Sequence, residues 1–235
     1  MFIVVEGTDS SGKATQTELL IGRLKNSGYG VVKMDFPAYG TPFGEMVARY
    51  LRGEFGSLKS VPPEVAALLY AMDRYQFKDR MFADLKRGRV LIANRYLESN
   101  IGYQGAKFSG GEKKRFIQWM KGVESRLPQA DVVVFLDMPS EAAASLMEKR
   151  GEKSYLKGKK KDIHEEDARY QESVRKTYLE EGRANGWIII NCAEKLGSSW
   201  RIRSVEDVHA EIWERIKSFL SGRSFVSSSR KTRAL

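Results

Sequence analysis

Residues 7–13 read Gly-Thr-Asp-Ser-Ser-Gly-Lys and could bind phosphate groups. Their spacing is that of the G-x-x-x-x-G-K loop, in which backbone N–H groups surround phosphate oxygens and the lysine reaches the β- and γ-phosphates of a nucleotide. The apolar run 2–5 precedes the loop and a helical pattern follows it, which is the strand–loop–helix context that the motif requires. We therefore predict a nucleotide-binding phosphate loop, with Lys13 as a catalytic residue.

The residue after this lysine departs from the motif. Position 14 is Ala14, where Ser or Thr normally directs a hydroxyl toward Mg²⁺. Mg²⁺ often binds through nucleotide phosphates and keeps several waters, so nucleotide binding does not depend on that hydroxyl. We therefore expect Mg²⁺ to be held mainly by phosphates and water, without a direct protein ligand.

Two other strand candidates are followed by polar and aromatic side chains. In an open parallel sheet, ligands bind beyond the carboxyl ends of the strands. We therefore expect these side chains to lie with the phosphate loop at one edge of the sheet. They are Phe36, Pro37 and Tyr39 after residues 31–35, and Asn94, Arg95, Ser99, Asn100, Tyr103 and Gln104 after residues 90–93.

Tyr70 and Arg74 are four residues apart in a helical pattern, so they share one face of a helix. A stacking ring beside a guanidinium could receive a base that carries carbonyl oxygens. Each residue also has a plainer interpretation. Tyr70 could pack in the core, Arg74 could pair with Glu or Asp, and Arg95 at its strand end could be structural.

Residues 149–161 form a basic segment between two helical patterns, and Asp162-Ile163-His164-Glu165 is expected to begin the second helix, with His164 as a polar residue at its start. The variable positions of the phosphate loop, Thr8 to Ser11, hold no Arg or Lys. A further cation on the phosphates would therefore come from this basic segment as it closes. Arg150 is the first candidate, because a guanidinium at a helix end can contact phosphate through two nitrogens. The alternative is a solvated charged loop.

Composition restricts the class of protein. The 235 residues carry 40 Lys and Arg against 30 Asp and Glu, a net charge of +10. Residues 147–161 (seven basic, two acidic) and 222–235 (four basic, none acidic) supply nine of these charges, so a broad nucleic-acid-binding face is not expected. The one cysteine, Cys192, excludes an internal disulfide and cysteine-pair zinc sites, and the two histidines exclude a histidine-rich metal cluster. No apolar run resembles a signal peptide or a membrane span, so we expect a cytoplasmic protein without membrane partners.

Five short apolar runs alternate with longer helical patterns, as in a doubly wound α/β domain. The expected strands are Phe2–Val5, Val31–Asp35, Val90–Ala93, Val132–Leu136 and Trp187–Ile190, each apolar enough to be buried on both faces. Helices are expected over 13–27, from Pro62-Pro63 to about Arg87, from an N-cap at Ser140 to about Arg150, and after Ser204, with Val208, Ile212 and Ile216 on one face. Residues 1–221 are expected to form one domain and 222–235 a flexible basic tail.

Together these motifs resemble the thymidylate kinase family, in the family's order and from Met1 to about Leu220. They are the Asp-containing phosphate loop, Phe36-Pro37, the segment 70–75 (Tyr-Ala-Met-Asp-Arg-Tyr), Asn94-Arg95-Tyr96 with Ser99, Tyr103-Gln104-Gly105, and a basic lid over about 150–162. The resemblance implies a five-stranded parallel sheet of order 2-3-1-4-5 with helices on both faces. It also implies phosphorylation of dTMP to dTDP with ATP and Mg²⁺, in a protein that is usually a homodimer.

The resemblance further implies roles for individual residues. Asp9 would accept a hydrogen bond from the sugar 3′-hydroxyl, Tyr70 would stack on thymine, Arg74 would read its O4 carbonyl, Asn100 would contact the base edge, Tyr103 would disfavour a ribose, and Arg95 would bridge the two sets of phosphates. Phe36, Pro37, Tyr39, Ser99 and Gln104 complete the expected dTMP site. Asp162 and Glu165 resemble acidic residues at the base of the lid. The expected ATP-binding residues are Gly7, Thr8, Asp9, Ser10, Ser11, Gly12, Lys13, Ala14 and Thr15.

A second departure is Asn94, where the family usually has Asp beside the metal. Asn retains the hydrogen-bonding shape but lacks the negative charge, so Asp9 and Asn94 are expected near Mg²⁺ rather than as firm ligands. No base is lost, because the attacking phosphate oxygen is already ionised. Two alternatives remain. One is a kinase of the same fold that acts on another nucleotide, such as dUMP, or on a nucleoside. The other is a nucleotide-binding regulatory module with weak catalysis.

Overall fold

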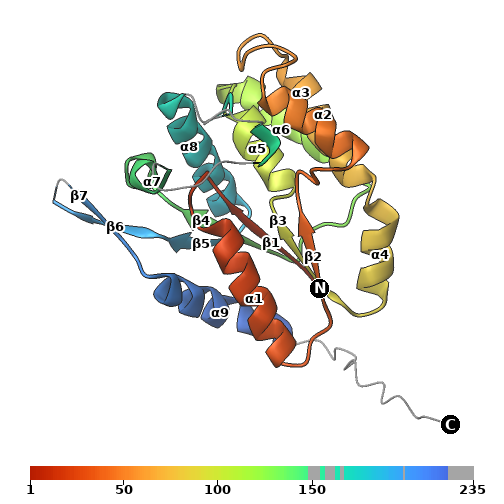
Figure 1. Cartoon of the computed structure of the whole chain (residues 1–235), viewed down its shortest axis with the longest axis vertical. Helices are drawn as coiled ribbons and strands as arrows, with labels where there is room; N and C mark the ends of the chain where they lie inside the picture. Colours follow the sequence, from red (N-terminus) through yellow and green to blue (C-terminus); the bar gives the residue numbers. More distant parts are fainter. Residues whose placement is uncertain (148–153, 157–161, 165–166, 198, 222–235) are drawn as a thin grey trace.

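A central parallel sheet organises the chain (Figure 1). The computed structural model describes residues 1–147, 154–156, 162–164, 167–197 and 199–221. Within them, one sheet has five strands in the order β2-β3-β1-β4-β5, and all neighbours pair in parallel. The predicted order and the three-layer arrangement are confirmed.

The strands begin and end within two residues of the predicted runs. They are β1 (Phe2–Gly7), β2 (Val31–Asp35), β3 (Val90–Asn94), β4 (Val132–Asp137) and β5 (Ile188–Asn191). β1 and β4 are buried along their whole length, as expected for central strands covered on both faces, whereas the edge strand β2 is partly exposed.

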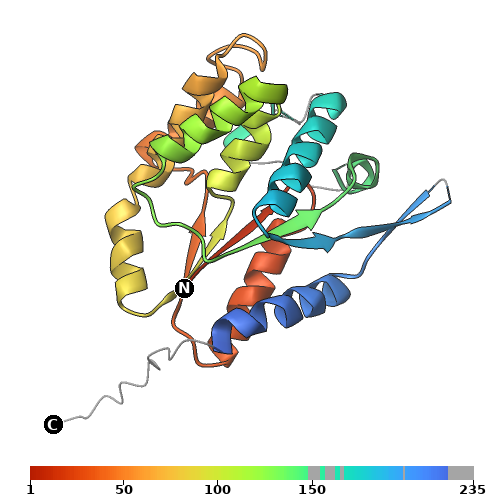
Figure 2. The same ribbon diagram turned by 180° about the vertical axis from the view of Figure 1, so that it is seen from behind.

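Helices cover both faces of the sheet (Figures 1 and 2). Because side chains alternate along a strand, Ile3 and Val5 of β1 pack with α1, α7 and α9, while Phe2 and Val4 pack with α3, α4, α5 and α6. The helices are α1 (Lys13–Asn26), α2 (Pro42–Leu51), α3 (Pro63–Tyr75), α4 (Lys78–Lys86), α5 (Leu97–Gly105), α6 (Gly110–Val123), α7 (Ser140–Met147), α8 (Ala168–Ala184) and α9 (Val205–Ser221), with a 3₁₀ turn, η1 (Ser154–Leu156).

The last helix forms as its sequence predicts. The Ser204 hydroxyl accepts a hydrogen bond from the backbone N–H of Asp207 at 3.0 Å, which caps α9. Val208, Ile212 and Ile216 are all buried in the core beside α1. Ser140, in contrast, is the first residue of α7 rather than its N-cap, and its hydroxyl donates to Glu172 Oε2 at 2.7 Å.

The prediction of one helix from residue 62 to residue 87 is wrong, because α3 ends at Tyr75 and α4 begins at Lys78. Between them, Gln76 Nε2 donates to Asp73 Oδ1 at 2.8 Å. Phe77 packs edge-on against Phe36, with ring centroids 5.9 Å apart. Packing of the partly buried Phe77 on the buried Phe36, just after β2, overrides the local helical pattern.

One prediction for the C-terminal third is also wrong. The helix expected from residue 162 begins at Ala168, where the Asp167 carboxylate accepts the backbone N–H groups of Arg169 and Tyr170. A hairpin that the sequence did not predict follows β5. In it, β6 (Ala193–Leu196) pairs antiparallel with β7 (Ser199–Ile202), and the pair projects beyond β5 (Figure 2).

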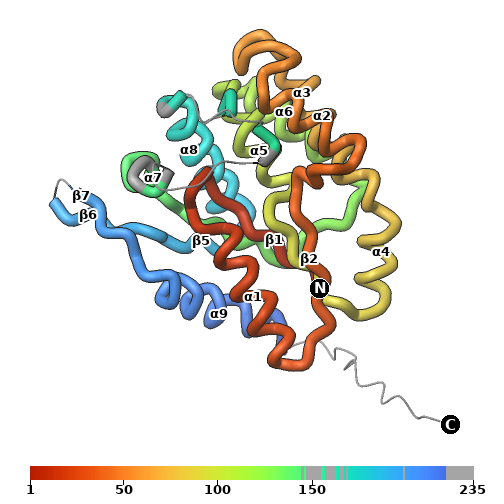
Figure 3. Tube along the Cα trace, in the orientation of Figure 1, coloured from red at the N-terminus to blue at the C-terminus, as the bar shows by residue number. Residues whose placement is uncertain are grey.

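Most of the expected lid and the whole expected tail, 222–235, lie outside the described residues. The helices before and after the lid, α7 and α8, lie at the end of the sheet that also carries the loop between β1 and α1 (Figure 3). Within the described ranges, no helix is long and apolar enough to cross a membrane.

Candidate active site

The loop between β1 and α1 is closely packed. A Cβ on Gly7 would lie 2.3 Å from Ser11 Oγ, and Gly12 has a φ of 85°, so both positions favour glycine. Lys13 Nζ donates to the backbone oxygen of Thr8 at 2.6 Å. The hydroxyl oxygens of Thr8 and Ser11 are buried and have no hydrogen-bond partner among the described residues. Such unsatisfied polar atoms at the N-terminus of α1 suit a phosphate ligand.

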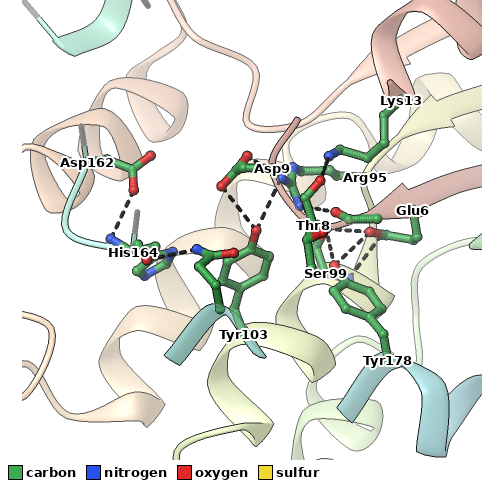
Figure 4. Close-up of polar contacts among 12 residues, drawn as sticks. Glu6, Thr8, Asp9, Lys13, Arg95, Ser99, Tyr103, Asp162, His164 and Tyr178 are labelled. Carbon is green, nitrogen blue, oxygen red and sulfur yellow. Dashed lines mark hydrogen bonds and ion pairs between the residues drawn. The ribbon is translucent and has the colours of Figure 1, made fainter. Parts of the chain in front are cut away.

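Arg95 connects this loop to α5 (Figure 4). Its backbone has a φ of 68°, which is uncommon for a residue other than glycine and is often found at functional sites. The guanidinium donates to Gly7 O at 3.2 Å and to Asp9 Oδ1 at 2.9 Å. The Tyr103 hydroxyl donates to the other oxygen of the same carboxylate, Asp9 Oδ2, at 3.2 Å. The phosphate loop, β3 and α5 thus meet at one charged group.

Burial and the neighbouring charges together set the protonation states of Arg95 and Tyr103. Burial alone would lower the pKa of Arg95, but electrostatic interactions with the Asp9 and Glu6 carboxylates raise it well above its ordinary value. Burial raises the pKa of Tyr103, and the neighbouring Asp9 carboxylate adds to the effect. Arg95 is therefore a permanent cation, and the Tyr103 hydroxyl stays protonated and able to donate.

Glu6 holds the start of α5, directly after Arg95, through hydrogen bonds, and this role was not predicted from the sequence. Its buried carboxylate accepts hydrogen bonds from the backbone N–H groups of Tyr96 and Ser99, at 2.8 and 3.0 Å. It also accepts from the hydroxyls of Ser99 and Tyr178, at 2.7 and 2.9 Å (Figure 4). A lone glutamate between apolar residues and the first glycine of the loop was the available signal, because a buried charge must have partners.

Next to Asp9 and Arg95 lies a cavity with an empty volume of about 430 Å³, which includes its open mouth. Several predicted residues line it: Asp9, Pro37, Tyr39 and Arg95 from the strand ends, Tyr70, Ser99, Asn100 and Tyr103 from α3 and α5, and Asp162. Three lining residues were not predicted for this site, namely Leu51, Tyr155 and His164. The tertiary structure thus gathers six separate parts of the chain around one space.

Other predicted residues do not line this cavity. Phe36 is buried against Tyr96 and Phe77, and Gln104 is fully buried. Arg74 is 1% exposed and makes two hydrogen bonds to Glu124, at 2.5 and 2.6 Å, so the ion-pair interpretation describes its observed contacts. Its expected role in reading a base carbonyl stays a prediction.

The structure places part of the expected lid base over the cavity. Asp162 accepts hydrogen bonds from the Tyr155 hydroxyl at 2.8 Å and from the backbone N–H of His164 at 2.9 Å. The Tyr155 ring stacks on Tyr39, with centroids 4.3 Å apart and an interplanar angle of 17°. Arg150 and Glu165, the other lid residues predicted for the site, lie outside the described residues.

The oxygen ligands available for Mg²⁺ are few. Among the described residues, no group of three or more His, Cys, Asp or Glu side chains could hold a metal ion. Asn94, opposite Val5 of β1, has a buried Oδ1 without a hydrogen-bond partner among those residues, while its Nδ2 donates to Asp35 at 3.2 Å. Such an orphaned oxygen suits a hard cation. The donor set therefore fits Mg²⁺ only when nucleotide phosphates supply most of the ligands.

Beside the site, Glu98 yields a prediction about stability and pH. Burial, reinforced by Glu6, raises the pKa of Glu98 from 4.5 to about 8. Between these values the folded chain holds a proton that the unfolded chain has lost, so stability should fall as pH rises from about 4.5 to 8. At about 1.4 kcal/mol per pKa unit, this dependence amounts to at most about 5 kcal/mol.

Urea unfolding of the wild type and the Glu98→Gln variant across pH 5 to 9 measures this effect. We expect the variant to become progressively more stable than the wild type as the pH rises, and the difference to level off above about pH 8. Parallel stability curves for the two proteins would show that Glu98 is not protonated in the folded state.

The chain resembles known proteins over almost its whole length. The sequence model described as thymidylate kinase matches residues 5–212. A thymidylate kinase of Plasmodium falciparum is 28% identical over 92% of this chain and 89% of its own length. A probable thymidylate kinase of Pyrobaculum aerophilum is 31% identical over 92% of this chain and 96% of its own length. The structure of thymidylate kinase from Candida albicans shares the fold, with a TM-score of 0.70 at 23% identity and coverage of 94% of this chain and 93% of that chain. The chain therefore belongs to the thymidylate kinase family.

Proposed function

We propose that this chain transfers a phosphoryl group from ATP to dTMP, forming dTDP for dTTP synthesis. The position of Asp9 carries the proposal. Asp9 belongs to the phosphate loop, and it also lines the neighbouring cavity. A donor phosphate in the loop and an acceptor phosphate in the cavity would therefore be adjacent, as direct transfer between two bound nucleotides requires.

In this proposal the cavity holds dTMP. Tyr70 stacks on the base, Asn100 contacts its edge, and Asp9 accepts from the sugar 3′-hydroxyl. Burial and the neighbouring Tyr50 raise the pKa of Tyr70, so its ring stays neutral and suits stacking on a neutral base. Pro37, Tyr39, Ser99 and Tyr103 complete the lining of the proposed acceptor site. Phe36, Arg74 and Gln104 do not line the cavity, and their part in binding dTMP stays a prediction.

The phosphate loop, residues 7–15, holds the donor in the same proposal. Lys13 neutralises charge on the β- and γ-phosphates, and Arg95 lies between the two nucleotides. Arg150 supplies a further cation from the lid, with Asp162 and Glu165 at the lid base. No general base is needed, because the attacking phosphate oxygen is already ionised.

We propose Mg²⁺ as the metal that accompanies ATP. When bound, it would supply charge neutralisation on the donor phosphates. Asn94 Oδ1 is the described protein oxygen best suited to approach it, and Asp9 is the nearby carboxylate. Since Asp9 already accepts from Arg95 and Tyr103, the phosphates and water remain the main ligands.

Formation of nucleoside diphosphate from dTMP, dUMP, UMP, CMP, AMP and GMP with Mg-ATP tests the function. We expect a strong preference for dTMP. Preference for another acceptor would assign the site to a different nucleotide kinase. Tight ATP binding without turnover of any acceptor would favour the regulatory module.

We propose that the protein is a cytoplasmic homodimer, a state usual in the family. Val65 and Leu68 on α3 and Trp119 on α6 are large apolar residues that stay exposed in a single chain. Glu64 and Trp119 line one open groove, so these two helices present a common face. Light scattering after size-exclusion chromatography should give twice the chain mass, and Leu68→Glu should give the mass of one chain. A wild-type monomer would contradict the proposal.

A further inference from the structure

His164 is an unassigned residue at the edge of the cavity. It is 4% exposed and lies before α8 rather than inside it. Its backbone N–H donates to Asp162, and its backbone oxygen accepts from Gln171 Nε2 at 2.8 Å. Its Nε2 lies 3.1 Å from the Tyr50 hydroxyl. Hydrogen bonds therefore fix the position of His164 both at its backbone and at the Nε2 atom of its imidazole ring.

This ring packs face-on against Tyr103. The two centroids are 5.1 Å apart and the rings are inclined by 22°. Tyr170 meets both rings edge-on, at 6.4 Å from Tyr103 and 5.7 Å from His164, and its hydroxyl donates to the backbone oxygen of Tyr103. Tyr178 contacts Tyr103 edge-on at 6.3 Å. His164 is thus the stacked member of the aromatic group that fixes the Tyr103 ring.

The other end of Tyr103 carries the hydroxyl that donates to Asp9 (Figure 4). A side chain excludes an added hydroxyl group on a substrate only when it cannot move aside. Pockets that merely contact an extra hydroxyl discriminate by about 10²-fold, and less when they can relax. The rigidity of Tyr103 therefore governs how strictly the sugar is selected.

We propose that His164 is a positioning residue that immobilises Tyr103 and thereby sets the preference for a 2′-deoxyribose over a ribose in the acceptor nucleotide. The proposal rests on the dTMP kinase function proposed above. The residues between the basic segment and α8 would then have two roles. They connect the lid to α8, and through His164 they also shape the acceptor site.

The test compares kcat/KM for dTMP with kcat/KM for its ribose counterpart, 5-methyluridine 5′-monophosphate. We expect His164→Ala and His164→Asn to lower this ratio at least tenfold, mainly through a lower KM for the ribonucleotide. His164→Phe keeps a ring against Tyr103 and should restore the ratio. The control is His209→Ala, which removes the only other histidine, on α9.

Two outcomes would overturn the proposal. One is an unchanged ratio in a folded His164→Ala protein. The other is that His164→Ala lowers the ratio by the same factor in a Tyr103→Ala protein as in the wild type, because an effect exerted through Tyr103 must vanish when Tyr103 is absent. Thermal melting of each variant shows whether it is folded, and the Phe variant keeps the test open if the Ala variant is not.

Binding constants for the two nucleotides repeat the comparison without turnover. If the wild type binds both nucleotides but phosphorylates neither, the proposed function fails while the inference about His164 is still decided by the ratio of Kd values. Labelled histidine adds a second readout, since the chain has two histidines. Added dTMP should shift the His164 NMR signal and leave that of His209 in place, and a shift of neither signal would place His164 away from the nucleotide.

Discussion

Replacement of Lys13 by alanine should lower kcat by about 10²- to 10³-fold or more at saturating ATP and dTMP, because one preorganised charge on a transferred group contributes on that scale. The ammonium lies against the phosphate loop, 2.6 Å from the backbone oxygen of Thr8, so it is positioned before a nucleotide binds. A coupled assay of ADP formation gives kcat, and circular dichroism shows whether the fold is retained.

Lys25→Ala is the matched control for this substitution. Lys25 is an exposed lysine in the last turn of the same helix, α1, far from its phosphate-binding end. We expect its activity to equal that of the wild type. If Lys13→Ala also kept the wild-type kcat, the phosphate loop would not be the donor site.

Arg74→Ala should be the most destabilising single substitution considered, with a loss of about 3–5 kcal/mol, because it leaves the buried Glu124 carboxylate without its cation. Arg74 and Glu124 are both 1% exposed and share two hydrogen bonds. Asn100 Nδ2 also donates to Glu124, at 3.3 Å, but a neutral amide does not replace the guanidinium charge. Urea unfolding at neutral pH measures the loss.

The control is an exposed pair, Arg201 with Glu194 on the β6–β7 hairpin. Arg201→Ala should cost no more than about 1 kcal/mol, as is usual for surface ion pairs. An equally small loss for Arg74→Ala would mean that Glu124 finds another partner.

A double variant separates stability from substrate recognition at Arg74. Replacement of both partners by apolar residues of similar size, Arg74→Met with Glu124→Leu, removes the stranded charge and should recover much of the stability. If Arg74 also reads the thymine carbonyl, this folded protein should show a raised KM for dTMP and a nearly unchanged KM for ATP. Equal changes in both KM values would confine Arg74 to a structural role.

Local patterns were enough to predict the sheet and the phosphate loop. Each of the five strands follows a short, largely apolar run between helical patterns, and such runs favour strands of a parallel sheet covered on both faces, as β1 and β4 are. The spacing of Gly7, Gly12 and Lys13 determines the loop, because a Cβ at Gly7 would collide with Ser11 and Gly12 needs a positive φ. These constraints act over a few residues, so they can be recognised in the sequence.

The break between α3 and α4 and the partners of the buried charged residues depended on contacts between distant parts of the chain. Phe77 lies at the break in a predicted helix, where it packs on Phe36. Arg74 pairs with Glu124, which is 50 residues further along the chain. Glu6 has its partners at the start of α5 and on α8, about 90 and 170 residues further along the chain.

The cavity shows the same division. Most of its predicted residues follow strand ends or lie on the helices after them, whereas Tyr155, within the expected lid, and His164, just after it, come from a distant part of the chain. The sequence alone determined the five strands of the parallel sheet, the glycine positions of the loop after β1 and the edge of the sheet at which most of the predicted site residues gather, because these follow from local backbone geometry and runs of apolar residues. Only the tertiary structure decided which buried charges pair and which aromatic rings enclose the cavity, because those choices depend on packing between residues that no local pattern connects.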